Sequence, residues 1–342
     1  MRGTLFAGVN LIGDALETTQ TVREWKRNHP KEPILYVAQD EEKVRVLLKN
    51  PFIDRVKFVQ DWDRLRTLRG YGDFTKKHLF DVGKAWDYGI DRKMHMSQAY
   101  AALAGVDAGS LLPVLRLVDA EKIGAKQFIP EGRFVVICPH SVSSSVDNND
   151  RGGNKLWGDS NWRKLVPIIH EMGFTVVSLG ASQDPKFNID GLIERHGLPI
   201  RTSCAVMDAA DYVVTLDSGT AHIAAALNKN LVEIYPNCLP PEWVFPHVSH
   251  CRVLYNYPPD IPVKLVAEAL DELIGEVEGR PEKAKKTKEP ILMPFIHVAD
   301  NEKLGDGEGF EDCNDGAPKG PRNNEEDIDE DADENTDEEN DG

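Results

Sequence analysis

The sequence predicts an α/β protein made of two doubly wound domains, followed by a disordered acidic C-terminal tail. Short apolar runs alternate with stretches of helical spacing, as strands and helices do around a parallel sheet. The alternation starts again near residue 130, which indicates a second, similar half. Residues 301–342 carry 18 acidic and 3 basic residues, a charge of −15 out of a total of −17, so the rest of the chain is nearly neutral.

Residues 1–129 are expected to form the first domain. Its predicted strands are GTLFAGV (3–9), PILYVAQ (33–39) and DRVKFVQ (54–60). A glycine-bearing turn, NLIGDAL, follows the first strand. Helices are expected at 17–30, 41–50 and 94–106, and an extended segment at 111–118. Residues 119–133 are expected to start as a helix and to run into a polar connector, with the domain boundary near Ile129.

Residues 130–279 are expected to form the second domain. Strands are predicted at 134–140, 175–181 and 211–216, and in the apolar run that ends at Tyr235. Helices are predicted at 160–173, at 188–197, after the Asp217 turn and at 261–277. Residues 280–342 have the composition of a linker and then of a self-repelling tail with almost nothing to bury.

The composition also excludes several classes of protein. No apolar window is long enough to span a bilayer, and glycines and an aspartate interrupt the N-terminal stretch before a signal-peptide core forms, so we expect a cytoplasmic protein. Five cysteines without CxxC spacing argue against a disulfide framework or a zinc site. The folded part has no basic stripe with interleaved aromatics, so no nucleic-acid binding is expected.

The stretch TLDSGTAH places a turn and a helix start directly after a buried strand. In a parallel sheet this is where ligands bind, and a helix start offers unpaired N–H groups to an anion. Ser218 or Thr220 is expected to cap the helix, Gly219 to let a phosphate approach, and Asp217 to accept hydrogen bonds from sugar hydroxyls. The alternative is a capped, buried helix whose His222 faces the core.

Two further residues belong to the same hypothesis. Lys155 lies in the glycine-rich loop GGNKLWGD, where it can reach a diphosphate, although a solvated surface lysine is the alternative. Asp14 follows a glycine in the first loop of the other half, where it can act as a general base, although an aspartate that only caps the next helix is the alternative.

Three stretches, GDALETTQTVREWKRNHP, KLWGDSNWRKL and LDSGTAHIAAAL, together resemble the ADP-heptose:lipopolysaccharide heptosyltransferase family. NPFIDRVKFV and RKMHMSQAYAALAG support the resemblance, which covers most of residues 1–275. It implies the GT-B architecture, in which two Rossmann-like domains face a cleft. The first domain would hold mainly the acceptor and the second the nucleotide-sugar donor.

The resemblance also implies a mechanism, an inverting and metal-independent transfer without a cofactor. Asp14 would take the proton from the acceptor hydroxyl. Lys155 and the helix start from Ser218 to His222 would stabilise the departing diphosphate. Asp217 would hold donor hydroxyls, and Ser141 would contact a phosphate.

The chain departs from the family pattern at two places. It inserts VSSSVDNNDRGG between CPHS and NKLW, and it reads GASQDPK where family members carry a glutamate for the nucleotide ribose, leaving Gln183 or Asp184 as ribose candidates. ADP-heptose is therefore only the default donor. The acceptor is expected to be a glycan or a lipid-linked glycan, with at most peripheral membrane contact.

Two other functions are compatible with the sequence. Another GT-B enzyme, such as a sugar-nucleotide epimerase, would share the diphosphate site but would use further carboxylates and histidines of the cleft on the sugar. Asp14 distinguishes the two, because only a transferase needs it for transfer. A noncatalytic GT-B-fold binding protein would depend on its acidic tail and would tolerate Asp14→Asn.

Overall fold

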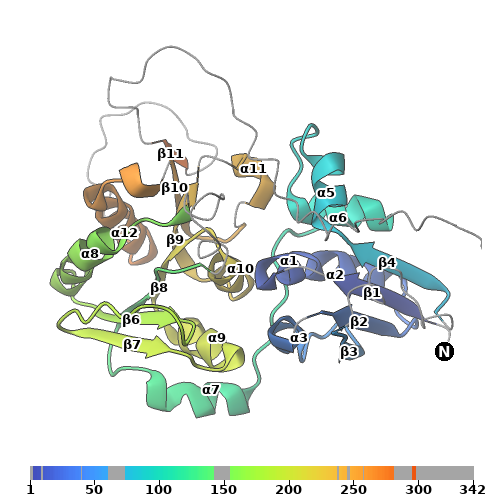
Figure 1. The fold of residues 1–342 in the computed structure, drawn as a ribbon, viewed down its shortest axis with the longest axis horizontal. Coiled ribbons are helices and arrows are strands. Elements are labelled where there is room, and N and C mark those ends of the chain that lie inside the picture. The colour runs from blue at the N-terminus through green and yellow to red at the C-terminus, as the bar shows by residue number, and fades with distance from the viewer. Residues whose placement is uncertain are drawn as a thin grey trace, which may run out of the picture.

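The computed structural model of the protein describes residues 3–8, 11–39, 41–60, 74–141, 155–236, 239–244, 247–256, 258–280 and 295–297. These residues form two lobes, each built around its own parallel sheet (Figure 1). Within the described ranges, no helix has the length and apolar character needed to cross a membrane.

The first lobe contains a four-stranded parallel sheet in the order β3-β2-β1-β4. Its strands are β1 (Thr4–Gly8), β2 (Ile34–Ala38), β3 (Arg55–Phe58) and β4 (Lys76–Phe80). Its helices are α1 (Ile12–Glu17), α2 (Thr19–Asn28), α3 (Glu41–Leu47), α5 (Val82–Gly89) and α6 (Met96–Ala104). The strand order reverses direction between β1 and β4, which places α1 at a topological switch point.

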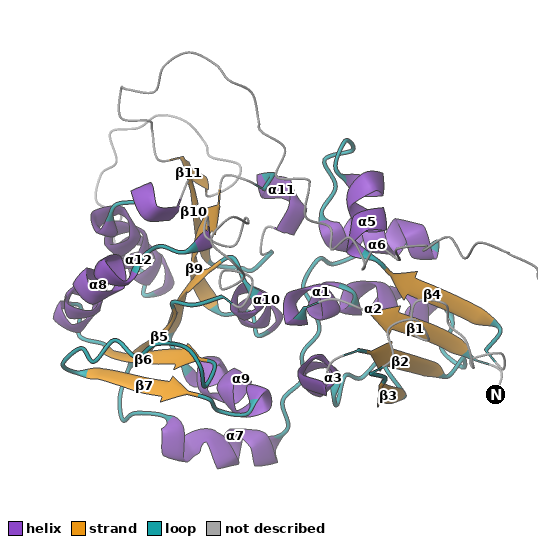
Figure 2. Ribbon diagram, viewed as in Figure 1, coloured by secondary structure: helices purple, strands orange, loops and turns teal. Residues whose placement is uncertain are grey.

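The second lobe contains a seven-stranded parallel sheet in the order β11-β10-β9-β8-β5-β6-β7 (Figure 2). Its strands are β5 (Phe134–Cys138), β6 (Thr175–Gly180), β7 (Leu192–His196), β8 (Tyr212–Leu216), β9 (Asn230–Pro236), β10 (Cys251–Asn256) and β11 (Phe295–His297). Its helices are α8 (Asp159–Glu171), α9 (Ile200–Ala209), α10 (Gly219–Ala226), α11 (Pro241–Val244) and α12 (Val263–Val277), with a 3-10 turn η4 (Pro258–Asp260). Here the switch point lies between β5 and β8.

Helices cover both faces of the second sheet because its central strands are apolar on both sides. Val135 and Ile137 of β5 pack in one core with residues of α8 and α12. Val136 and Cys138 face the other way, into a core that includes residues of α9 and α10. That second core continues into the first lobe, so one apolar cluster joins the two domains.

A helical connector links the lobes and packs against the second one. It consists of α7 (Asp119–Ala125) and the 3-10 turn η1 (Lys126–Phe128). Arg201 of α9 is buried against this connector and donates to both carboxylate oxygens of Glu121, at 2.8 and 2.7 Å. The same guanidinium also donates to the carbonyl oxygens of Leu48 at 3.1 Å and Arg116 at 2.6 Å, so one side chain ties α9 to α7 and to the end of α3.

The structure corrects two sequence predictions. The segment 188–197, predicted as a helix, contains strand β7, because Gly191 and Gly197 both adopt left-handed φ angles and leave a stretch too short for a helix between them. The turn predicted at NLIGDAL is instead the start of α1, so Asp14 lies in the first helical turn.

The segment 280–342, predicted as linker and tail, contains a described strand. Residues 295–297 form β11, which pairs in parallel with β10 and belongs to the second sheet. The acidic residues 301–342 lie outside the described part of the chain, as does the inserted segment 142–153.

Candidate active site

The two switch points meet at the junction of the domains. Helix α1 begins just beyond the carboxyl end of β1, and α10 begins beyond the carboxyl end of β8 (Figure 1). A Cβ built on Gly219 would lie 3.4 Å from Cβ of Ile12 and 3.6 Å from the backbone nitrogen of Gly13, which are ordinary van der Waals distances. The first turns of the two helices therefore pack against each other.

This close packing requires a glycine on the α1 side. A Cβ built on Gly13 would lie 2.4 Å from Cδ2 and 2.9 Å from Nε2 of His222. Both distances are shorter than real Cβ contacts, so the imidazole of His222 occupies the space that any side chain at position 13 would need. The glycine that precedes Asp14 thus allows the second domain to approach α1.

The start of α10 has the geometry that the sequence predicted. Ser218 is the N-cap, and its hydroxyl accepts a hydrogen bond from the backbone N–H of Thr220 at 3.3 Å. The hydroxyl of Thr220 also bonds to those of Ser218, at 2.7 Å, and Thr215, at 2.6 Å. Ser218, Gly219 and Thr220 are only partly buried, so a ligand can reach the helix start.

Lys155 and Asp217, which are distant in the sequence, come together beside this turn. Nζ of Lys155 donates to Oδ2 of Asp217 at 2.7 Å. The Asp217 side chain is nearly buried at 4% exposure, whereas that of Lys155 is 22% exposed. The buried carboxylate therefore anchors the ammonium group at the edge of the sheet.

His222 is buried, as the alternative interpretation expected, and it forms an ion pair with the first domain. Its Nδ1 lies 2.8 Å from Oε1 of Glu17, the last residue of α1. Burial by itself raises the pKa of Glu17, but the hydrogen bond and charge of His222 lower it to about 2. Burial lowers the pKa of His222, but the bond and charge of Glu17 raise it to about 9. The lowered pKa of Glu17 and the raised pKa of His222 both favour the charged pair at neutral pH.

A second buried carboxyl group lies close to these residues. Glu233 in the middle of β9 is 1% exposed, and its Oε2 has no hydrogen-bond partner among the described residues. Burial raises the pKa of Glu233 well above its ordinary value, and the charge of Asp217 raises it further. The neutral form of Glu233 is therefore favoured.

Asp14 lies in the first turn of α1, next to the residue that contacts His222. Its Oδ2 accepts a hydrogen bond from the backbone N–H of Leu11 at 2.9 Å, so the carboxylate does stabilise the helix start. The side chain remains partly exposed at the domain junction. Asp14 is therefore not the N-cap of a helix that begins at Ala15; it is the third residue of α1 and stabilises the N-cap residue Leu11. This position is compatible with a second role for the carboxylate.

The other predicted residues lie around the same sheet edge. Ser141 follows β5 by three residues. Gln183 is exposed in the turn after β6. Asp184 in this turn accepts a hydrogen bond from the backbone N–H of Ala181 at 2.7 Å, so its carboxylate holds the turn together.

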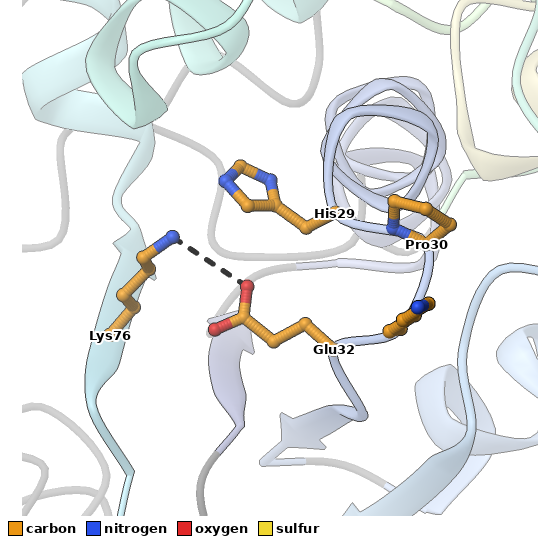
Figure 3. Close-up of a pocket in the computed structure, with 5 residues that line it drawn as sticks. His29, Pro30, Glu32 and Lys76 are labelled. Atoms are coloured by element: carbon orange, nitrogen blue, oxygen red, sulfur yellow. Dashed lines mark ion pairs between the residues drawn. The ribbon is translucent and has the colours of Figure 1, made fainter.

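A hollow elsewhere in the first domain does not belong to this site. Figure 3 shows it between His29, Pro30, Glu32 and Lys76, where the ion pair Lys76–Glu32 spans 3.6 Å. Glu32 precedes β2 and Lys76 begins β4. The hollow therefore lies at the amino ends of the strands, opposite the edge where parallel sheets bind ligands.

Sequence reasoning missed Glu17 and Glu233. Glu17 follows Asp14 by three residues and therefore lies near it on the same helical face. Glu233 is the single charged residue in the run NLVEIY, and an acidic side chain inside an apolar strand signals a buried polar site. The described residues contain no group of three or more His, Cys, Asp or Glu side chains arranged to hold a metal ion.

Comparisons with known proteins agree with this architecture. The chain is similar in fold to ADP-heptose lipopolysaccharide heptosyltransferase II of E. coli, with a TM-score of 0.62 and 19% identity over 81% of this chain and 99% of that one. It is also similar to a family 9 glycosyltransferase of Veillonella parvula, with a TM-score of 0.65 and 16% identity over 80% of this chain and 98% of that one. For E. coli heptosyltransferase WaaC with ADP, the TM-score is 0.57, with 14% identity over 80% of this chain and all of that one. No curated protein sequence matches the chain significantly.

Two parallel-sheet domains that meet at the carboxyl ends of their strands define a glycosyltransferase fold of the GT-B type. The family model of glycosyltransferase family 9 (heptosyltransferase) matches residues 57–253, more than half of the chain. The chain therefore belongs to this family, which confirms the resemblance drawn from the sequence motifs.

Proposed function

We propose that this protein moves a sugar, with heptose as the first candidate, from a nucleoside diphosphate sugar to a hydroxyl group of a glycan. The observation that carries the proposal is the group at the switch point of the second sheet. There, the Lys155–Asp217 pair lies beside the capped start of α10, and this helix start packs against the α1 turn that carries Asp14. The donor-binding half and the base are thus contributed by different domains.

The second domain supplies the chemistry for the leaving group. The N–H groups at the start of α10 and its helix dipole favour an anion, and Lys155 adds a full positive charge at the same edge. Its anchoring by Asp217 keeps the ammonium group there before the donor arrives, so little reorganisation is needed as charge develops on the diphosphate. This positive charge comes from the protein, which is why we propose a transfer that does not depend on a metal ion.

The first domain supplies the proton acceptor. In the proposed inverting step the acceptor oxygen attacks the anomeric carbon and the bond from that carbon to the diphosphate oxygen breaks. The proton of the attacking hydroxyl passes to Asp14, and the nucleoside diphosphate leaves with the electron pair. A single displacement of this kind inverts the anomeric configuration.

The proposal also names the donor ligands, the residues that would contact them, and the acceptor. ADP and ADP-heptose are the first ligands to test, because the WaaC structure to which the chain is similar was solved with ADP. Ser141 is proposed to contact a phosphate. Gln183 is a better ribose candidate than Asp184, whose carboxylate holds its own turn. We also propose a cytoplasmic enzyme that meets a lipid-linked glycan at the membrane surface.

Release of nucleoside diphosphate from a panel of nucleotide sugars, measured with and without glycan acceptors, tests this function. Asp14→Asn is expected to retain nucleotide binding and to lose acceptor-dependent release by about 100-fold or more, the range of general-base catalysis. The control is Asp119→Asn, which alters another aspartate in the first turn of a short helix, away from this site. Equal loss in both variants, or no loss in Asp14→Asn, contradicts the assignment of Asp14.

A further inference from the structure

Glu17 is a buried carboxylate that contacts groups of both domains. It is 3% exposed at the end of α1. Its Oε2 accepts hydrogen bonds from the hydroxyl of Ser97 and from Nε2 of Gln20, the latter at 2.9 Å. Its Oε1 lies 2.8 Å from Nδ1 of His222 in the second domain. A buried charge is tolerated only when it is paired and hydrogen-bonded in this way.

The two oxygens of Glu17 thus make different contacts. Oε2 is fixed by side chains of the first domain, which sets the orientation of the whole carboxylate. Oε1 is thereby presented to His222, which belongs to α10. Since Nδ1 faces Glu17, the remaining ring nitrogen, Nε2, lies against Gly13, one residue from Asp14.

We propose that Glu17 is a positioning residue for the transfer reaction: it fixes the imidazole ring of His222 and holds it as a cation whose Nε2–H lies at the junction of α1 and α10. This inference rests on the proposed function, in which the diphosphate departs beside the start of α10. Glu17 itself does not touch the substrate and acts through His222.

The surrounding charges explain why a partner is needed. A cation near the N-terminus of a helix opposes the helix dipole, and burial of His222 disfavours its charged form as well. Asp217 and Glu233 are the acidic groups that face His222 from the second domain, but Glu233 is held in its neutral form and Asp217 is paired with Lys155. Glu17 therefore carries most of the stabilisation of the imidazolium.

Two other histidines face the same carboxylate without displacing His222. Nδ1 of His95, at the start of α6, lies 3.9 Å from Oε2 of Glu17 and is bonded to Ser97. His247 packs against His95, and burial lowers its pKa although Glu17 raises it. Nδ1 of His222 lies within hydrogen-bond distance of Glu17, at 2.8 Å, whereas Nδ1 of His95 lies farther away, at 3.9 Å. Because Glu17 and His222 come from different domains, the cation forms only when the domains adopt this arrangement.

The charge of His222 can be measured directly by NMR of ¹⁵N,¹³C-histidine-labelled protein, with His222→Gln identifying its signals. In the wild type both ring nitrogens of His222 are expected to be protonated at pH 8. In Glu17→Gln the ring is expected to be neutral at this pH, and in the control Glu41→Gln, an exposed glutamate of α3, it is expected to stay charged. A neutral His222 in the wild type at pH 8 overturns the proposal, and that result does not depend on any variant of Glu17 folding.

Activity adds a readout that a purely structural contact would not change. If the pKa of His222 falls from about 9 to its ordinary 6.5 or lower, its charged fraction at pH 8 drops about 30-fold or more. The kcat of Glu17→Gln is therefore expected to fall by a similar factor at pH 8 and much less near pH 6, while KM for the donor changes little. A pH profile parallel to that of the wild type overturns the role of Glu17.

Failure of the proposed function gives a different result. If the wild type neither binds nucleoside diphosphates nor releases them from nucleotide sugars, the proposed function is wrong, and the role of Glu17 in transfer falls with it. If the wild type transfers sugar but His222 titrates identically in the wild type and in Glu17→Gln, only the inference about Glu17 is wrong.

Discussion

The contact between Gly13 and His222 can be tested by replacing the glycine with alanine in two backgrounds. In the wild type the new methyl group would lie 2.4 Å from Cδ2 and 2.9 Å from Nε2 of the imidazole. The ring cannot simply turn away, because Nδ1 is held by Glu17. The helices must therefore separate or the ion pair must distort.

Two effects of opposite sign determine the result. Overpacking of this kind costs about 1–3 kcal/mol. Alanine in place of glycine within a helix stabilises by up to about 1 kcal/mol. In the wild-type background we expect Gly13→Ala to destabilise the protein by up to about 2 kcal/mol. In the His222→Ala background the obstructing ring is gone, so Gly13→Ala should stabilise by up to about 1 kcal/mol.

The four proteins are the wild type, Gly13→Ala, His222→Ala and the double variant. Their thermal and chemical unfolding measures the coupling free energy between positions 13 and 222. Each kcal/mol corresponds to about 2–4 °C in Tm for proteins of 150–250 residues, so a change of sign between backgrounds is readily detected. Both proteins with His222→Ala lack the Glu17–His222 pair, so its loss cancels when Gly13→Ala is measured in that background. If Gly13→Ala has the same sign and size in both backgrounds, α1 and α10 do not pack as described.

Arg201→Ala is expected to lower the free energy of unfolding by about 2–4 kcal/mol, because Glu121 and backbone carbonyls lose their buried donor; chemical denaturation with a loss below about 1 kcal/mol would contradict this. The Glu17–His222 pair is expected to stabilise most between about pH 4.5 and 6.5. Its contribution is lost as Glu17 protonates toward pH 2 and as His222 deprotonates toward pH 9, and parallel stability curves for the wild type and His222→Gln would refute this. Glu233→Gln is expected to raise Tm more at about pH 8 than at about pH 5, because the unfolded chain ionises Glu233 above its ordinary pKa of 4.5 while the folded protein keeps it neutral; equal gains at both pH values would contradict this.

Local pattern predicted much of the fold. The apolar strands β1, β2, β5, β6 and β8 were predicted because strands buried on both faces form continuous apolar runs. β4 was not predicted, since its sequence KKHLF begins with three polar residues and its parallel pairing with β1 compensates for weak local propensity. The segment of β7 resembled a helix because five residues are too few to distinguish the two periodicities.

The candidate site was predicted less completely, for a different reason. Ser218 as the cap of α10 follows from residues adjacent in the sequence. The ion pairs cannot be predicted from neighbouring residues in this way. Lys155 and Asp217 are 62 residues apart, and Glu17 and His222 are 205 apart. Such pairs depend on how the sheet and the two domains assemble, which no local pattern encodes.

The most direct test of the central claim is nucleotide binding by the purified wild type, Lys155→Ala and Lys164→Ala, measured as thermal stabilisation by ADP, UDP, GDP and their sugars. Lys164 is an exposed lysine of α8 and serves as the matched control. A nucleotide at about 100 times its Kd should stabilise the wild type and Lys164→Ala by about 2.7 kcal/mol, and Lys155→Ala should lose most of this effect. Stabilisation by no nucleotide, or the same stabilisation in all three proteins, would contradict a donor site at the start of α10.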